Sequence, residues 1–395
     1  MSARDAEPPL GPPSAPGWEV NAAGEPSYRD PNRRRARLTL AAGLMCVIGA
    51  VAGAAVARGR LPTMYVDFRP VLVSHGIDLD DVMVAAWARL KVQPLTPEQR
   101  HRGFNECYLP DPLGLGPYAA YQRPPGVVPV RVAIPQEGGH TDDMGFDVVV
   151  HFHGGDAVRK QLVQVTRGAV FVAIDLGLFS GPYMTTFMQE RRWEQVKQQI
   201  TRALRDQTGD RRAHIRHLAL SAWSAGYGAV NEILRRNGDE GIDAVVLLDG
   251  MHASQNLQHP THDNSIESLS SDTLRGIFDF AGRASRGEKI FVLTHSNIVP
   301  PGYASVRQSA DLLLHELGLQ REQRDRTSGL MHQLTSVDHE GFHVWGYEGR
   351  DKEAHCAHTT MLGPIVRDLL EPAWNTPKMN RDVPPTPAPK LGSAQ

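Results

Sequence analysis

The stretch LALSAWSAGYGAV, residues 218–230, decides the expected fold, because it joins an apolar strand to a helix through a serine. Ser224 follows the strand-like run IRHLALSAW (215–223) and precedes a helical run over 226–236. Ala222 and Gly226 stand two residues before and after it. A sharp strand-to-helix turn tolerates only small residues at those positions and exposes its serine above the sheet. The pattern predicts a nucleophilic serine, and the alternative is a tightly packed turn without chemistry.

Further runs of β-forming residues flank this turn and alternate with helical stretches. Several runs have apolar residues at successive positions rather than at alternate ones, as strands buried on both faces do. We therefore expect an α/β fold with a mostly parallel sheet and helices on both faces. The runs are VVPVRVAI (127–134), FDVVVHF (146–152), AVFVAIDL (169–176), DAVVLLDG (243–250), KIFVLTH (289–295) and GFHVWGY (341–347), and further helices are expected over 185–206, 272–284, 305–317 and 358–370.

A second motif, HFHGGD (151–156), ends the run FDVVVHF. Together with A-W-S-A-G around Ser224, it resembles the α/β-hydrolase family, whose serine turn reads G-x-S-x-G and whose His-Gly-Gly loop precedes that turn. One motif glycine is alanine here, and the resemblance covers about residues 127–372. It implies that Ser224 is the nucleophile. It also implies that the backbone N–H groups of Gly154, Gly155 and Ala225 form an oxyanion hole.

The resemblance also implies an acid and a histidine, in the chain order serine, acid, histidine. The segment 294–310 after KIFVLTH contains no Asp or Glu, so we expect the acid to be Asp249, at the tip of DAVVLLDG. The alternative for Asp249 is a helix cap or turn residue. The family's histidine follows the last strand, which favours His355 over His358 and His343. The residues expected to contact substrate are His153, Trp223, His252, His295 and Tyr303.

These residues predict hydrolysis of a small-molecule carboxylic ester through an acyl-enzyme, without a cofactor. Peptidase and acyltransferase chemistry use the same triad and stay open. One alternative is a metal-dependent hydrolase, because His151, His153, His355 and His358 supply four imidazoles, although Asp156 falls one residue late for H-x-H-x-D. Another alternative is a catalytically inactive hydrolase-like binding module.

The charge balance bears on possible partners. Lys plus Arg number 42 and Asp plus Glu number 44, so nothing in the composition indicates a nucleic-acid-binding surface. We expect a neutral or modestly charged substrate.

The stretch LTLAAGLMCVIGAVAGAAVA (38–57) carries no charge and is long enough to cross a bilayer. We expect residues 33–60 to form a membrane anchor or a signal peptide. The length of the span favours the anchor, and the A-x-A pair Ala55 and Ala57 favours cleavage. Arginines 33, 34, 35 and 37 place the N-terminus inside, so either alternative puts the catalytic domain outside the cytoplasm, at the cell envelope.

The remaining segments are assigned by composition. Residues 1–32 are rich in Pro, Gly and Ala, and residues 376–395 are rich in Pro and polar residues. Both segments are predicted to be disordered tails. Residues 61–126 are expected to form a helical or loop extension that packs on a catalytic domain at 127–375. Cys107 and Cys356 either pair in an oxidising compartment or remain free thiols.

Overall fold

The computed structural model describes residues 18–20, 26–28, 115–255, 265–300, 303–328 and 331–384. The chain divides into two compact units, Met1–Leu90 and Lys91–Gln395. In the first unit, β1 (Trp18–Val20) pairs antiparallel with β2 (Pro26–Tyr28). Part of the stretch predicted to be a disordered tail therefore forms strands. The expected leader at 33–60, most of the extension at 61–126, and Cys107 lie outside the described residues.

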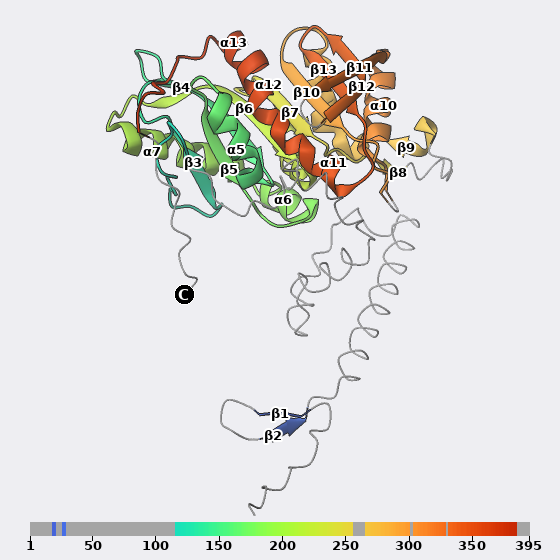
Figure 1. Ribbon diagram of the computed structural model, residues 1–395, viewed down its shortest axis with the longest axis horizontal. Coiled ribbons are helices and arrows are strands. Elements are labelled where there is room, and N and C mark those ends of the chain that lie inside the picture. The colour runs from blue at the N-terminus through green and yellow to red at the C-terminus, as the bar shows by residue number, and fades with distance from the viewer. Residues whose placement is uncertain are drawn as a thin grey trace, which may run out of the picture. The chain divides into compact units, whose positions relative to one another are not determined.

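The second unit contains a nine-stranded sheet in the order β11-β12-β13-β10-β7-β6-β4-β5-β3 (Figure 1). Every strand run predicted above is present, together with two strands that were not predicted. The strands are β3 (Val130–Ala133), β4 (Gly145–Phe152), β5 (Val170–Ile174), β6 (His214–Trp223), β7 (Ala244–Leu248), β10 (Ile290–His295), β11 (Glu322–Ser328), β12 (Met331–His339) and β13 (Phe342–Tyr347).

The centre of the sheet is parallel and its edges are antiparallel. Strands β5, β4, β6, β7, β10 and β13 pair parallel in that spatial order. At one edge β3 runs antiparallel to β5, and at the other β12 runs antiparallel to both β13 and β11. The mostly parallel sheet is confirmed. The unpredicted strand β11 is wholly polar and β12 has only scattered apolar residues, because an antiparallel edge pair does not need apolar residues on both faces.

Helices cover both faces of the sheet, as predicted. On one face α5 (Gly155–Val165) packs beside α12 (Leu362–Ile365), and Figure 1 shows these helices with α13 (Glu371–Trp374) crossing the same side. The opposite face carries the larger helical layer. Its members are α6 (Ser180–Phe187), α7 (Arg192–Thr208), α8 (Tyr227–Asn237), α9 (Arg275–Ala284) and α10 (Val306–Leu317).

Some helix boundaries differ from the prediction. The single helix expected over 185–206 is divided into α6 and α7, because Arg191 adopts a left-handed φ of 61° between them. Helix α5 was not predicted. The closing helix over 358–370 consists of a 3-10 turn (His358–Met361), α12 and a π-helical turn (Val366–Leu370).

The described part of the predicted C-terminal tail packs against the core. Met379 is 6% exposed, and its N–H donates to the carbonyl of Arg167. Asn380 N–H donates to the carbonyl of Glu137. Residues 376–384 therefore depart from the predicted disorder, because their backbone groups find partners at the edge of the sheet.

The described part of the expected extension also contacts the core. Leu115 and Tyr118 are buried, and the Tyr118 hydroxyl donates to the carbonyl of Ala169 at 2.8 Å. Among the residues that the structure describes, no helix combines the length and apolar character needed to span a membrane.

Candidate active site

Three residues of the predicted site stand at neighbouring strand ends in left-handed backbone conformations. His153 follows β4, Ser224 follows β6 and Asp249 follows β7, with φ values of 71°, 50° and 45°. Strands β4, β6 and β7 are parallel neighbours, so their carboxyl ends meet at one edge of the sheet. Side-chain-bearing residues rarely adopt positive φ, and such conformations concentrate at functional turns.

The turn at Ser224 is closely packed, which explains its small neighbours. A Cβ on Gly226 would lie 2.1 Å from the carbonyl oxygen of Phe152, so only glycine fits there. A Cβ on Gly250 would lie 2.2 Å from the carbonyl oxygen of Ser224, so the loop after β7 runs directly against the turn. Ala222 is buried within β6. Ser224 itself is partly exposed.

Asp249 and His355 form a hydrogen-bonded pair. His355, on α11 (Lys352–Ala357), donates Nδ1–H to Asp249 Oδ2 at 2.7 Å. With the proton on Nδ1, the Nε2 atom of the neutral ring is a hydrogen-bond acceptor. The acid-histidine pairing expected from the chain order is thus present in the geometry.

The carboxylate of Asp249 is buried yet well supplied with partners. Ser296 donates its backbone N–H to Oδ1 at 2.8 Å and its hydroxyl contacts Oδ2 at 2.9 Å. Burial alone would raise the pKa of Asp249, but the nearby His358 and His355 rings and the Ser296 N–H outweigh it and hold that pKa well below its usual range. Asp249 is therefore ionised at neutral pH and fixes the orientation of His355.

Trp223 connects the histidine-bearing helix to the glycine loop. Its indole Nε1–H donates to the carbonyl of His355 at 3.0 Å. Its ring lies 4.7 Å from the His355 ring and stacks on the His153 ring at 5.1 Å and 11°. A Cβ on Gly154 would lie 2.6 Å from the Trp223 ring. Trp223, predicted as a substrate contact, is thus packed between the two histidines.

The glycine loop offers fewer free N–H groups than predicted. The Gly155 N–H donates to Asp175 Oδ1 at 3.3 Å, so it is already directed at a carboxylate. Within the described part of the chain, no hydrogen bond is found for the Gly154 N–H. Ala225 lies in the first turn after the strand, Ser224–Gly226, where N–H groups lack intrahelical acceptors. Gly154 and Ala225 therefore remain the available donors.

His153 and His295 are both held by other side chains. His153 Nδ1 lies 3.0 Å from the hydroxyl of the buried Tyr183, and burial lowers the pKa of His153. His295 is 2% exposed, donates Nδ1–H to the Ser296 carbonyl at 2.9 Å and accepts from Arg321 at 2.9 Å. The expectation that His295 contacts substrate is wrong, because both of its ring nitrogens are used inside the protein.

The four imidazoles of the metal alternative do not converge. His151 donates Nε2–H to the His153 carbonyl at 2.8 Å, and its Nδ1 lies 3.0 Å from the Ser221 hydroxyl, so neither ring nitrogen is available to a metal. His358 is fully buried, with Nδ1 2.7 Å from Thr294 Oγ1. Across the described ranges, no three or more His, Cys, Asp or Glu side chains are grouped so as to hold a metal ion.

Sequence reasoning missed the residues that support Asp249. Ser296 directly follows the run KIFVLTH, and its role depends on the approach of two strand ends that are distant in sequence. Thr294 and His358 meet for the same reason. The only sequence signal is the absence of any acid in 294–310, which leaves a polar serine beside the acid of the preceding strand.

Cys356 directly follows His355 on α11. It is buried and takes part in a disulfide. Its partner lies outside the described residues. The cross-link therefore constrains the same short helix that presents His355.

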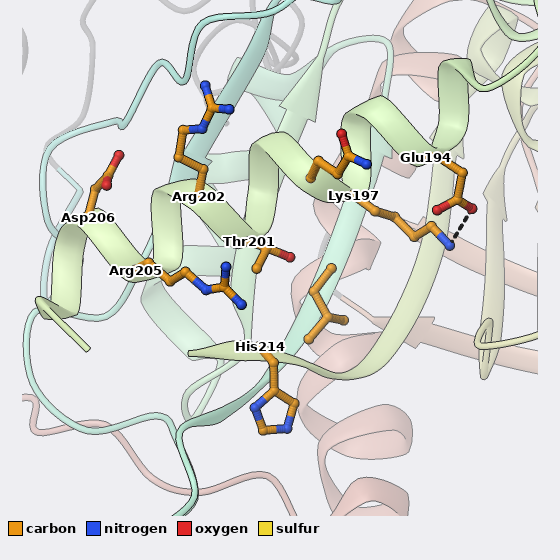
Figure 2. Close-up of a pocket in the computed structure, with 9 residues that line it drawn as sticks. Glu194, Lys197, Thr201, Arg202, Arg205, Asp206 and His214 are labelled. Atoms are coloured by element: carbon orange, nitrogen blue, oxygen red, sulfur yellow. Dashed lines mark ion pairs between the residues drawn. The ribbon is translucent and has the colours of Figure 1, made fainter. Parts of the chain in front are cut away.

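A groove of about 710 Å³ lies elsewhere on the molecule, along α7 and the first residues of β6 (Figure 2). Three of its charged side chains already have partners: Lys197 pairs with Glu194 at 2.6 Å, and Arg205 donates to the Ala213 carbonyl at 3.2 Å. The groove is at the amino end of β6, whereas Ser224 is at the carboxyl end. None of the predicted site residues lines it.

Comparison with known proteins gives distant structural likenesses. No protein-family model matches the sequence, and no curated protein matches it. The enterobactin esterase FES from Shigella flexneri is 13% identical with a TM-score of 0.37, over 65% of this chain and 60% of that chain. The feruloyl esterase module from Clostridium thermocellum is 8% identical with a TM-score of 0.36, over 69% and 91%.

A third likeness is to the ester-hydrolase EH1AB1 from the metagenome of Lake Arreo, at 14% identity and a TM-score of 0.38, over 75% of this chain and 97% of that chain. The chain covers less than two thirds of the length of the enterobactin esterase FES.

Proposed function

We propose that this protein is a serine hydrolase of the α/β-hydrolase type that cleaves carboxylic esters through Ser224, Asp249 and His355. The observation that carries the proposal is the 2.7 Å hydrogen bond from His355 to the buried Asp249, beside a partly exposed serine in a left-handed turn. The mixed sheet with helices on both faces fits this fold.

The proposed reaction begins when His355 Nε2 takes the hydroxyl proton of Ser224 as Oγ attacks the ester carbonyl carbon. The N–H groups of Gly154 and Ala225 stabilise the negative oxygen of the tetrahedral intermediate. Protonated His355, stabilised by the Asp249 carboxylate, then gives its proton to the departing alcohol. Water attacks the acyl-enzyme with His355 again as base, which releases the acid and restores Ser224.

A fluorophosphonate probe and p-nitrophenyl acetate test the proposal. We expect the probe to label the native protein and the ester to be hydrolysed. Both signals should vanish in Ser224→Ala. The matched control is Ser285→Ala, because Ser285 directly follows α9 and its hydroxyl donates to the Gly282 carbonyl, away from the site. Labelling that survives Ser224→Ala would refute the nucleophile.

The same assays separate the alternatives. A binding module would hydrolyse the ester no faster than Ser224→Ala does. A metal-dependent hydrolase would lose activity with a chelator, whereas the proposed mechanism is insensitive to it. Amide and alcohol-acceptor assays with the same pair of variants distinguish peptidase and acyltransferase activity from ester hydrolysis.

We also propose that the catalytic unit functions outside the cytoplasm, at the cell envelope. The apolar stretch 38–57 behind an arginine cluster supports this location, as does the disulfide at Cys356, because disulfides persist in oxidising compartments. The intact mass of the protein isolated from cells distinguishes an uncleaved anchor from a cleaved signal peptide. A catalytic unit protected from protease on intact spheroplasts would contradict the proposal.

A further inference from the structure

A cluster of three rings stands beside Ser224 and has no part in the proposed proton transfers. We call it the His252 cluster, and its members are Tyr227, His252 and Tyr303. Tyr227 is the third residue after Ser224, and its ring meets the His252 ring edge-on at 5.5 Å and 75°. Tyr303 meets the His252 ring at 4.8 Å and 88°.

The loop that carries His252 is fixed on both sides. It begins at Gly250, whose backbone lies against Ser224. Met251 is fully buried, and the Ala253 N–H donates to the Ser309 hydroxyl at 2.8 Å. His252 is therefore held in place next to the catalytic turn by its own chain, rather than carried on an exposed loop.

One nitrogen of His252 is used by the protein and the other is not. Nδ1–H donates to the Ala304 carbonyl at 2.8 Å, which leaves Nε2 as an acceptor in the neutral ring. Among the described residues, Nε2 has no hydrogen-bond partner. Burial lowers the pKa of His252, so the ring stays neutral and Nε2 stays an acceptor at neutral pH.

Exposed apolar side chains stand in loops at the edge of the sheet that also carries the cluster. Tyr303 and Val299, in the loop after β10, are 52% and 72% exposed, and Leu178, after β5, is 54% exposed. These loops follow strand ends at the same edge of the sheet as Ser224. Large exposed apolar side chains in these loops provide surface that can bind apolar groups.

We propose that the His252 cluster selects esters with an aromatic ring that bears a hydrogen-bond donor, such as a hydroxyaryl group. The aromatic ring of the substrate packs edge-on against Tyr303 and the side chains beside it. The hydroxyl of the substrate donates to His252 Nε2. This inference rests on the proposed function, because it assigns the substrate class of the Ser224 site.

The test compares the methyl esters of phenylpropanoic acid and of its para-hydroxy derivative. We expect the native protein to favour the hydroxylated ester by about fivefold in kcat/KM, the range of one hydrogen bond to a neutral acceptor. His252→Phe keeps a ring but removes the acceptor, so the ratio should fall to about one. Its fold is checked by circular dichroism. The matched control, His217→Phe, should keep the native ratio, because His217 stacks on Trp374 near the start of β6.

A second variant guards against a folding defect in His252→Phe. Tyr303 is exposed, so Tyr303→Ala should fold normally and raise KM for both aryl esters about threefold. The inference would be overturned if the native protein showed no preference for the hydroxylated ester, or if a folded His252→Phe kept that preference. In either case, Ser224-dependent hydrolysis of p-nitrophenyl acetate would leave the proposed function standing. Absence of that hydrolysis would instead overturn the proposed function, and this inference with it.

Discussion

The ring of His355 is joined to Asp249 by a 2.7 Å hydrogen bond, although 106 residues separate them in the chain. The carboxylate reaches this position at the end of β7 and the histidine reaches it from α11, after the last strand of the sheet. Neither residue is near the other until the parallel strands align their carboxyl ends. The pair therefore depends on tertiary folding. Replacing either residue should lower catalysis more than it lowers the free energy of unfolding.

We expect Asp249→Asn to lower kcat by about 10³-fold or more, since a neutral amide does not stabilise the imidazolium and does not fix the tautomer of His355. His355→Gln should lower kcat by a similar factor. Steady-state hydrolysis of p-nitrophenyl acetate measures both changes. His343→Gln is the matched control, because His343 pairs with Asp338 and should retain native activity. Native turnover in Asp249→Asn would exclude Asp249 as the triad acid.

Ser296 should prove to be a positioning residue for Asp249. Ser296→Ala removes the hydroxyl at 2.9 Å from Oδ2 and leaves the backbone N–H at 2.8 Å from Oδ1. We expect kcat to fall about tenfold with KM nearly unchanged, because one hydrogen bond to a charged group is lost. Ser296→Thr, which restores the hydroxyl, should recover most of the loss, and a merely structural role would not give that pattern.

Trp223 offers a separate test of how the His355 helix is held. Trp223→Phe keeps an aromatic ring beside His355 and His153 but removes the N–H that reaches the His355 carbonyl at 3.0 Å. We expect kcat to fall about fivefold while the free energy of unfolding decreases by about 1 kcal/mol. Kinetics and urea denaturation of the same sample give both numbers. An unchanged kcat would show that this hydrogen bond does not position the histidine.

The central strands were predictable because their chemistry is local. FDVVVHF and DAVVLLDG contain unbroken apolar stretches, VVV and AVVLL, and such a stretch is the signal of a strand that is buried on both faces. Strands β11 and β12 were not predictable from the same rule, because EQRDRTS contains no apolar residue and pairs at an edge of the sheet. The break at Arg191 was also hidden, since an arginine gives no local signal for the left-handed conformation that it adopts between α6 and α7.

The site residues also fall into those that the sequence predicts and those that it does not. Ser224, Asp249 and His355 were expected from motif and chain order, and the structure brings Asp249 and His355 into contact. The roles of His295 and Ser296 depend on contacts between distant strands and helices, which no local pattern encodes. A histidine near a strand end gives the same sequence signal whether it faces substrate or an internal arginine.

Three buried histidines should make the protein sensitive to acid. Burial lowers the pKa of His151 and His358 to about 4 and that of His295 to about 3, from an ordinary value of 6.5. In the unfolded chain these rings bind protons below about pH 6.5, whereas in the folded protein they do so only near pH 4 or lower. Between these values the unfolded state binds more protons, so the free energy of unfolding decreases as pH falls.

At pH 5 each of these rings should cost up to about 2 kcal/mol of stability relative to pH 8. Urea denaturation at pH 8, 6.5 and 5 measures the slope, and His358→Gln should reduce it by about one proton in that range. His332 serves as the matched control, because its ring is 37% exposed and pairs with Asp325 at the surface, so His332→Gln should leave the slope nearly unchanged. If the free energy of unfolding had the same slope against pH in His358→Gln and in the native protein, the prediction that the buried ring of His358 stays neutral in this range would be wrong.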